Sequence, residues 1–104
     1  MTTPATAFKV LTAQQWADFE RERVFRGAPV DIADGYIHLS TAGQLETTIA
    51  KYFAGETGLM IAEVDLVLLG DAIRWEPARG GDLFPHIYAE LPIHAVVSLQ
   101  KRDC

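Results

Sequence analysis

Two short stretches of this chain hold the residues best suited to chemistry, residues 36–40 (YIHLS) and 84–88 (FPHIY). Each stretch sets a histidine, His38 or His86, among aromatic and aliphatic residues in a strand-like run. Histidine titrates near neutral pH, so it serves as a general acid, a general base or a hydrogen-bonding group for a ligand. The two stretches are far apart in the sequence, and only the fold can bring them together.

Side chains of an extended strand alternate between its two faces. One face of the first stretch carries Tyr36, His38 and Ser40, and one face of the second carries Phe84, His86, Tyr88 and Glu90. If these faces meet, they form an aromatic cleft with two imidazoles, two phenols, a hydroxyl and a carboxylate, which suits a small polar ligand. The alternative is that each histidine is a core residue with one satisfied hydrogen bond.

Several other polar residues have two interpretations. Ser40 precedes a predicted helix and is better explained as a cap than as a nucleophile, while the backbone N–H groups of residues 41–43, beginning with Thr41, could hold a phosphate. Arg74 and Glu76 share a face of a short strand, either as a surface pair or with Arg74 lining the cleft. The chain has no Cys-x-x-Cys and no His-Glu-x-x-His pattern, so we predict no metal site.

The elements that must position these residues follow from periodicity and capping signals. We expect helices over residues 13–24 and 42–53, a loop over 26–35, and strands over 8–11, 36–39, 58–65, 73–76, 83–89 and 96–101. Thr12 with Gln15, and Thr41 with Gln44, have the spacing of a capping box. Pro85 predicts that its strand is an edge strand or carries a bulge. This order predicts an α+β fold with a mixed or mostly antiparallel sheet flanked by two helices.

Composition limits the class of protein. The chain has 104 residues, of which 49% are hydrophobic and 22% are charged, so we expect one globular domain over residues 7–104 after a disordered start over 1–6. The formal charge of -5 argues against binding DNA or RNA. The single cysteine, Cys104, excludes an intramolecular disulfide. No secretion signal or membrane-spanning run is present, which predicts a cytoplasmic protein.

Taken together, the strings at residues 35–41 (GYIHLST) and 84–88 (FPHIY), with Trp16 and the pairs at 64–65 and 75–76, resemble a small bacterial family. This is family 952 of the domains of unknown function, and the resemblance covers nearly the whole chain. The family is similar, more distantly, to the ADP-ribosyltransferase fold. That similarity implies a split β structure with a cleft between two small sheets, in which NAD sits as a substrate.

The resemblance assigns roles to residues of this chain. It implies that His38, His86 and Glu90 are catalytic and that Lys9, Tyr36, Ser40, Thr41, Arg74 and Tyr88 bind the ligand. Two positions depart from the family pattern. Lys9 stands where many members carry a first-strand histidine, and Ala89-Glu90 stands where glycine and proline are common. Glu90 is therefore an uncertain counterpart of the transferase glutamate, and Glu76 is the other carboxylate suited to orienting a hydroxyl.

Three functions follow as hypotheses from these residues. The first is binding of NAD, ADP-ribose or a related nucleotide, with or without ADP-ribosyltransferase-like chemistry. The second is a small hydrolase or phosphotransferase that uses His86 as a general base and His38 as an orienting group. The third is a non-catalytic interaction domain with structural histidines. None requires a bound cofactor, and the sequence leaves the oligomeric state open.

Overall fold

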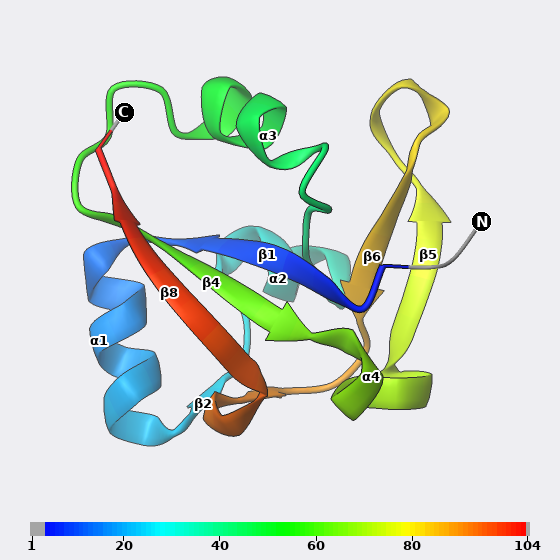
Figure 1. Ribbon diagram of the computed structural model, residues 1–104, viewed down its shortest axis with the longest axis horizontal. Coiled ribbons are helices and arrows are strands. Elements are labelled where there is room, and N and C mark those ends of the chain that lie inside the picture. Colours follow the sequence, from blue (N-terminus) through cyan, green and yellow to red (C-terminus); the bar gives the residue numbers. More distant parts are fainter. Residues whose placement is uncertain (1–3, 104) are drawn as a thin grey trace.

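The chain alternates strands and helices in its first half and continues mainly as strands in its second (Figure 1). The computed structural model describes residues 4–103, apart from the side chain of Arg79. The helices are α1 (Ala13–Glu22), α2 (Pro29–Asp34), α3 (Leu45–Tyr52) and α4 (Leu66–Leu69). The strands are β1 (Thr6–Leu11), β2 (Val24–Phe25), β3 (Ile37–His38), β4 (Leu59–Asp65), β5 (Ile73–Pro77), β6 (Leu83–Ile87), β7 (Leu91–Pro92) and β8 (Val96–Arg102). Short 3-10 turns cover Gly70–Ala72, Arg79–Gly81 and Ile93–Ala95.

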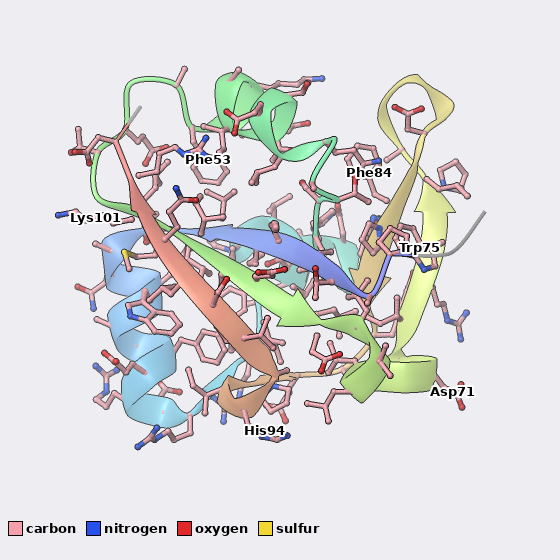
Figure 2. The ribbon with its side chains drawn as sticks, viewed as in Figure 1. Phe53, Asp71, Trp75, Phe84, His94 and Lys101 are labelled. Carbon is pink, nitrogen blue, oxygen red and sulfur yellow. The ribbon has the colours of Figure 1, made fainter. Side chains whose placement is uncertain are left out.

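The larger sheet has the order β1-β4-β8, and its strands β1 and β4 bury side chains on both faces, whereas β8 is mostly exposed. Because side chains alternate along β1, Ala7 and Leu11 face the cluster that contains Phe19 of α1, whereas Val10 faces the cluster that contains Ile49 of α3. Phe53, just after α3, packs against that second cluster and lies between the helix and the sheet in Figure 2. The first cluster also contains Ile37 and Ile87, so the smaller sheet packs into the same core.

The smaller sheet, with the order β3-β6-β5, holds both predicted histidines. His38 lies directly opposite His86 in the β3–β6 pair, and Arg74 lies opposite His86 in the β5–β6 pair. The two sheets meet at one rung, where Phe8 and Ser40 exchange backbone hydrogen bonds of 2.7 and 2.9 Å. The β structure is therefore split next to His38, because β3 continues toward β6 while β1 continues toward β4.

Pro85 lies in the central strand of the smaller sheet, so the predicted edge position is wrong. The carbonyl of Pro85 accepts a hydrogen bond from the N–H of Leu39, and in an antiparallel pair the nitrogen of the same residue points toward the same neighbour. The absent N–H of Pro85 therefore removes a single backbone hydrogen bond on the β3 side. It does so beyond the last residue of β3. The neighbouring residues, Phe84 and His86, keep the pairing with β5.

The expected α+β class is confirmed. All strand pairs among residues 4–103 are antiparallel, which agrees with the second of the two expected arrangements. Two details differ. The same residues form four α-helices rather than two, because the predicted loop over 26–35 contains α2 and the connection after β4 contains α4. The start of α2 carries the usual signals, Pro29 at the first helical position and Asp31 two residues later, whose carboxylate accepts the Ala28 N–H. Helix α3 begins at Leu45, three residues later than expected.

The predicted disordered start falls partly outside the described residues, since residues 1–3 lie there together with Cys104. Within the described part, the carbonyl of Ala5 accepts a hydrogen bond from Leu66, and Thr6 begins β1. No helix formed by residues 4–103 is long and apolar enough to cross a membrane.

We expect Thr12→Ala to lower the free energy of unfolding by about 1 kcal/mol, measured by urea denaturation. The Thr12 hydroxyl accepts the Gln15 N–H at 3.1 Å while the Gln15 side chain accepts the Thr12 N–H at 2.9 Å, so both halves of the predicted capping box are formed. Thr47→Ala, at an exposed position inside α3, is the matched control and should be neutral or slightly stabilising. Equal losses in the two variants would contradict the capping role.

Candidate functional site

Four rings gather on one side of the smaller sheet, those of Tyr36, His38, His86 and Tyr88, and we call them the ring cluster. Tyr36 stacks on His86 with ring centroids 4.1 Å apart and planes 24° apart. Tyr36 also lies 4.7 Å from His38 and 5.2 Å from Tyr88, and the two imidazoles lie 5.4 Å apart at a steep angle. The two sequence stretches therefore come together, which the sequence left open, and the alternation pattern gives the faces that meet.

The strand register explains why the rings meet. Leu39 and Pro85 form a hydrogen-bonded rung, so the adjacent His38–His86 rung is of the non-hydrogen-bonded type. Facing side chains approach most closely at such rungs. Tyr36 lies just before β3 and Tyr88 just after β6, so they join the two imidazoles at the end of the strand pair.

His38 is held between two carboxylates. Its Nδ1 lies 2.6 Å from Asp31 Oδ1, and its Nε2 lies 2.9 Å from Asp34 Oδ2. A neutral imidazole can donate from only one of its nitrogens, so this geometry suits the imidazolium form. Asp31 is almost fully buried, whereas Asp34 is about half exposed at the end of α2. The inner contact is therefore shielded from water and the outer one is open to replacement by a ligand.

Asp31 is the central partner of this half of the site. Its carboxylate contacts Lys9 Nζ at 3.0 and 3.1 Å and accepts the backbone N–H groups of Ala28 at 2.7 Å and His38 at 3.0 Å. Burial alone would raise the pKa of Asp31, but the hydrogen bonds from His38 and Ala28 and the charge of Lys9 outweigh it and lower the pKa to about 2. Asp31 therefore stays ionised inside the protein.

Lys9, predicted to bind the ligand, lies in the interior. Its ammonium contacts Asp31 and also donates to the backbone carbonyl of His38 at 3.0 Å. Burial lowers the pKa of Lys9, and the charge of Asp31 opposes that shift. Lys9 therefore positions His38 from the interior of the protein, through its contacts with Asp31 and with the His38 carbonyl.

His86 has its own carboxylate, Glu76. The Nδ1 atom of His86 lies 2.7 Å from Glu76 Oε1, and the hydroxyl of Tyr88 donates to the same oxygen at 2.7 Å. These hydrogen bonds lower the pKa of Glu76, and the contact with Glu76 raises the pKa of Tyr88. Burial, followed by the charges of Asp34 and Glu76, raises the pKa of Tyr36. Within residues 4–103, no protein group hydrogen-bonds the Nε2 atom of His86.

The remaining predicted residues are placed differently. Arg74 lies beside the ring cluster, with its guanidinium carbon 5.0 Å from the centroid of Tyr88. The buried hydroxyl of Ser40 pairs with Thr48 at 2.8 Å, and the N–H of Thr41 is taken by Gln44 at 3.0 Å. Glu90 forms an exposed ion pair with Arg26 at 2.8 Å and does not contact either imidazole.

Sequence reasoning missed two acids, Asp31 and Asp34, and ranked a third, Glu76, below Glu90. The helix-start pattern of Pro29 followed by Asp31 could have located the first. The alternation of Arg74 and Glu76 on one strand face could have favoured Glu76, because β5 pairs with β6 opposite His86. No signal in the sequence places Asp34 on the far nitrogen of His38.

One shallow hollow adjoins the site, and a second has no residue of the ring cluster in its lining. One, of about 360 Å³, includes Tyr36, Tyr88, Ile32, Arg26 and Glu90 in its lining, so it opens beside the ring cluster. The other, of about 310 Å³, lies between the start of α3 and the β5–β6 loop and includes Lys51 and Phe84. Within the described residues, no three His, Cys, Asp or Glu side chains are grouped so as to hold a metal ion.

We expect Lys9→Met to lower the free energy of unfolding by about 3 kcal/mol, because it leaves the buried carboxylate of Asp31 without its ammonium partner and the His38 carbonyl without its donor. Urea denaturation measures this loss. Lys101→Met, at an exposed position of β8, removes the same charge elsewhere and should change stability by less than about 0.5 kcal/mol. Similar effects of the two substitutions would contradict the positioning role of Lys9.

The lowered pKa of Asp31 predicts how stability depends on pH. The pKa of Asp31 is about 2 in the folded protein, below its ordinary value of 3.8, so the folded state favours the ionised form. Its contribution of about 2 kcal/mol is fully present well above pH 3.8 and is lost as the pH falls through that value toward 2. A carbon-13 NMR titration of the Asp31 carboxyl gives the folded midpoint directly, and a midpoint at or above 3.8 would refute this account.

Comparisons with known proteins agree with the family predicted from the two histidine stretches. A crystal structure of protein CC0527 from Caulobacter crescentus is similar to this chain with a TM-score of 0.91 and 37% identity, covering 94% of this chain and 86% of that one. The solution NMR structure of CC0527 gives a TM-score of 0.86 at 36% identity, covering 96% of this chain and 86% of that one. No curated protein matches the chain. The model for the protein family of unknown function DUF952 matches residues 10–99, and the chain therefore belongs to that family.

Proposed function

We propose that the ring cluster binds NAD, ADP-ribose or a related nucleotide. The observation that carries this proposal is the gathering of two imidazoles and two phenols, with a carboxylate on the Nδ1 atom of each imidazole. His86 is buried, whereas Tyr36, His38 and Tyr88 reach the surface. Aromatic faces suit a heteroaromatic base, and carboxylates and imidazoles suit ribose hydroxyls. The resemblance to ADP-ribosyltransferases, which stays a prediction, supports the same ligand class.

The contacts suggest a role for each residue. Tyr88 is 41% exposed and is suited to stack on the base. Asp34 contacts only one side of His38 and is half exposed, so a ribose hydroxyl could exchange with it. Glu76 takes the place that we predicted for Glu90, because it contacts both His86 and Tyr88.

Transferase chemistry would use these same groups. Breaking the bond between ribose and nicotinamide leaves the bonding electrons on the nicotinamide nitrogen and develops positive charge on the ribose. Carboxylates such as Glu76 and Asp34 would stabilise that charge. The acceptor, water or another nucleophile, would then form a bond to the ribose carbon and lose its proton.

A hydrolase or phosphotransferase is the second candidate, and one observation favours it. Both imidazoles are held at Nδ1 by a carboxylate, which is the arrangement that orients a histidine for proton transfer at Nε2. In His38 the Nε2 atom is occupied by Asp34, whereas in His86 it has no partner among residues 4–103. The Nε2 atom of His86 is therefore the one not already taken by a group of the described residues, although the His86 side chain is buried and that of His38 is about one third exposed.

An NMR titration with NAD, ADP-ribose and inorganic phosphate tests the proposal. We expect NAD or ADP-ribose to shift the imidazole signals of both His38 and His86, while His94, on an exposed turn outside the ring cluster, stays unchanged. Tyr88→Ala should weaken binding by about threefold to tenfold, because one stacking face is lost. Tyr52→Ala, which removes another exposed tyrosine on α3, is the matched control and should bind normally.

The titration separates the hypotheses. If no nucleotide moves either imidazole at millimolar concentration, the nucleotide proposal is wrong. If inorganic phosphate alone shifts His86 as strongly as NAD does, the phosphotransferase candidate is favoured. If neither imidazole responds to any ligand and both His38→Ala and His86→Ala lose about 1–3 kcal/mol of stability, the histidines are structural.

A further inference from the structure

The arginine of β5 is a feature of the site to which the proposed function gives no role. Arg74 is exposed and lies opposite His86 in the β5–β6 register. Its guanidinium lies over the ring of Tyr88, at 5.0 Å from the centroid. A guanidinium at this distance is attracted to the negative face of the ring, which restrains it beside the ring cluster.

Arg74 keeps its hydrogen-bond donors available. Three other arginines, Arg21, Arg26 and Arg102, each lie within 3.0 Å of a carboxylate oxygen. Within the described residues, no carboxylate comes within 4.0 Å of the Arg74 guanidinium. The neighbouring acid on the same strand face, Glu76, is engaged instead with His86 and Tyr88 through one oxygen.

The other cations near the site are already committed. Lys9 is buried and bound to Asp31 and to the His38 carbonyl. Arg26, at the adjoining hollow, is bound to Glu22 and Glu90. Of the cations described beside the ring cluster, Arg74 is therefore the one that can receive an anion without breaking an ion pair.

Charge is also distributed unevenly across the ring cluster. Asp34 and Glu76 both raise the pKa of the Tyr36 phenol, whereas Arg74 acts on Tyr88 in the opposite direction to Glu76. Beside Tyr88, the positive charge of Arg74 thus offsets part of the negative charge of Glu76.

We infer that Arg74 binds a phosphate of the ligand, so that the site selects a nucleotide over the nucleoside that lacks the phosphate. This inference rests on the proposed function and names the chemical group that sets its specificity. The planar guanidinium donates two parallel hydrogen bonds to a phosphate, and its position over Tyr88 reduces the freedom lost on binding.

Two ligand pairs that differ by one phosphate test this inference: nicotinamide mononucleotide with nicotinamide riboside, and AMP with adenosine. In the unmodified protein the nucleotide of at least one pair should bind about tenfold or more tightly than its nucleoside, as expected for a charge-assisted hydrogen bond. Arg74→Gln should reduce that ratio to about one without weakening the nucleoside, and Arg74→Lys should retain part of it. Arg21→Gln, which removes an exposed arginine of α1, should leave the ratio unchanged.

The outcomes separate this inference from the proposed function. If a nucleoside binds as tightly as its nucleotide, or if Arg74→Gln leaves the ratio intact, the role of Arg74 is refuted and the ring cluster remains a nucleoside site. If no compound of either pair shifts His38 or His86, the proposed function falls and this inference falls with it. Unchanged thermal unfolding of Arg74→Gln would show that a lost preference comes from recognition rather than from misfolding.

Discussion

The rest of the site depends on one buried interaction, the ion pair between Lys9 and Asp31. At the point where β1 and β3 part, the backbone N–H and carbonyl of His38 face away from β6 and have no strand to pair with. Asp31 accepts that N–H and Lys9 donates to that carbonyl, so the ion pair stands in for the missing strand. The same carboxylate then fixes the imidazole through Nδ1. One acid thus supports both the backbone and the ring of His38.

Burying two opposite charges is costly, and a well-packed apolar pair often gives equal stability. An apolar pair in this place would leave the His38 backbone unsatisfied, since neither side chain could donate or accept a hydrogen bond. That requirement gives a physical reason for charged residues in the interior of a small domain. The same requirement explains why Lys9 lies at a position of β1 whose side chain points into the core rather than toward solvent.

The local patterns of the sequence predict most of the elements and the face on which each histidine lies, because alternation and capping act within a few residues. They do not predict that the two histidine strands pair. Tyr36 and His38 on one face, and His86 and Tyr88 on another, are such local facts. The partners of the imidazoles are not local: Asp31 reaches His38 only because α2 folds back against β3, and Glu76 reaches His86 only through the β5–β6 register. The edge position predicted for Pro85 was wrong for a related reason. Whether its missing N–H costs a hydrogen bond depends on where the neighbouring strand β3 ends.

The two halves of the ring cluster differ in how firmly they are held. His38 is fixed through a carboxylate that is buried and bound by four protein groups, so a ligand could shift it only by disturbing Lys9 and the start of α2 as well. Tyr88, Glu76 and Arg74 lie at the rim and are partly exposed. One hydrogen bond joins Tyr88 to Glu76, and a ring contact joins Arg74 to Tyr88. The β5–β6 side can therefore adjust more readily than the Asp31 side, which supplies a constant geometry. For the nucleotide proposed above, this division would place an invariant part of the ligand at His38 and variable parts at Tyr88 and Arg74.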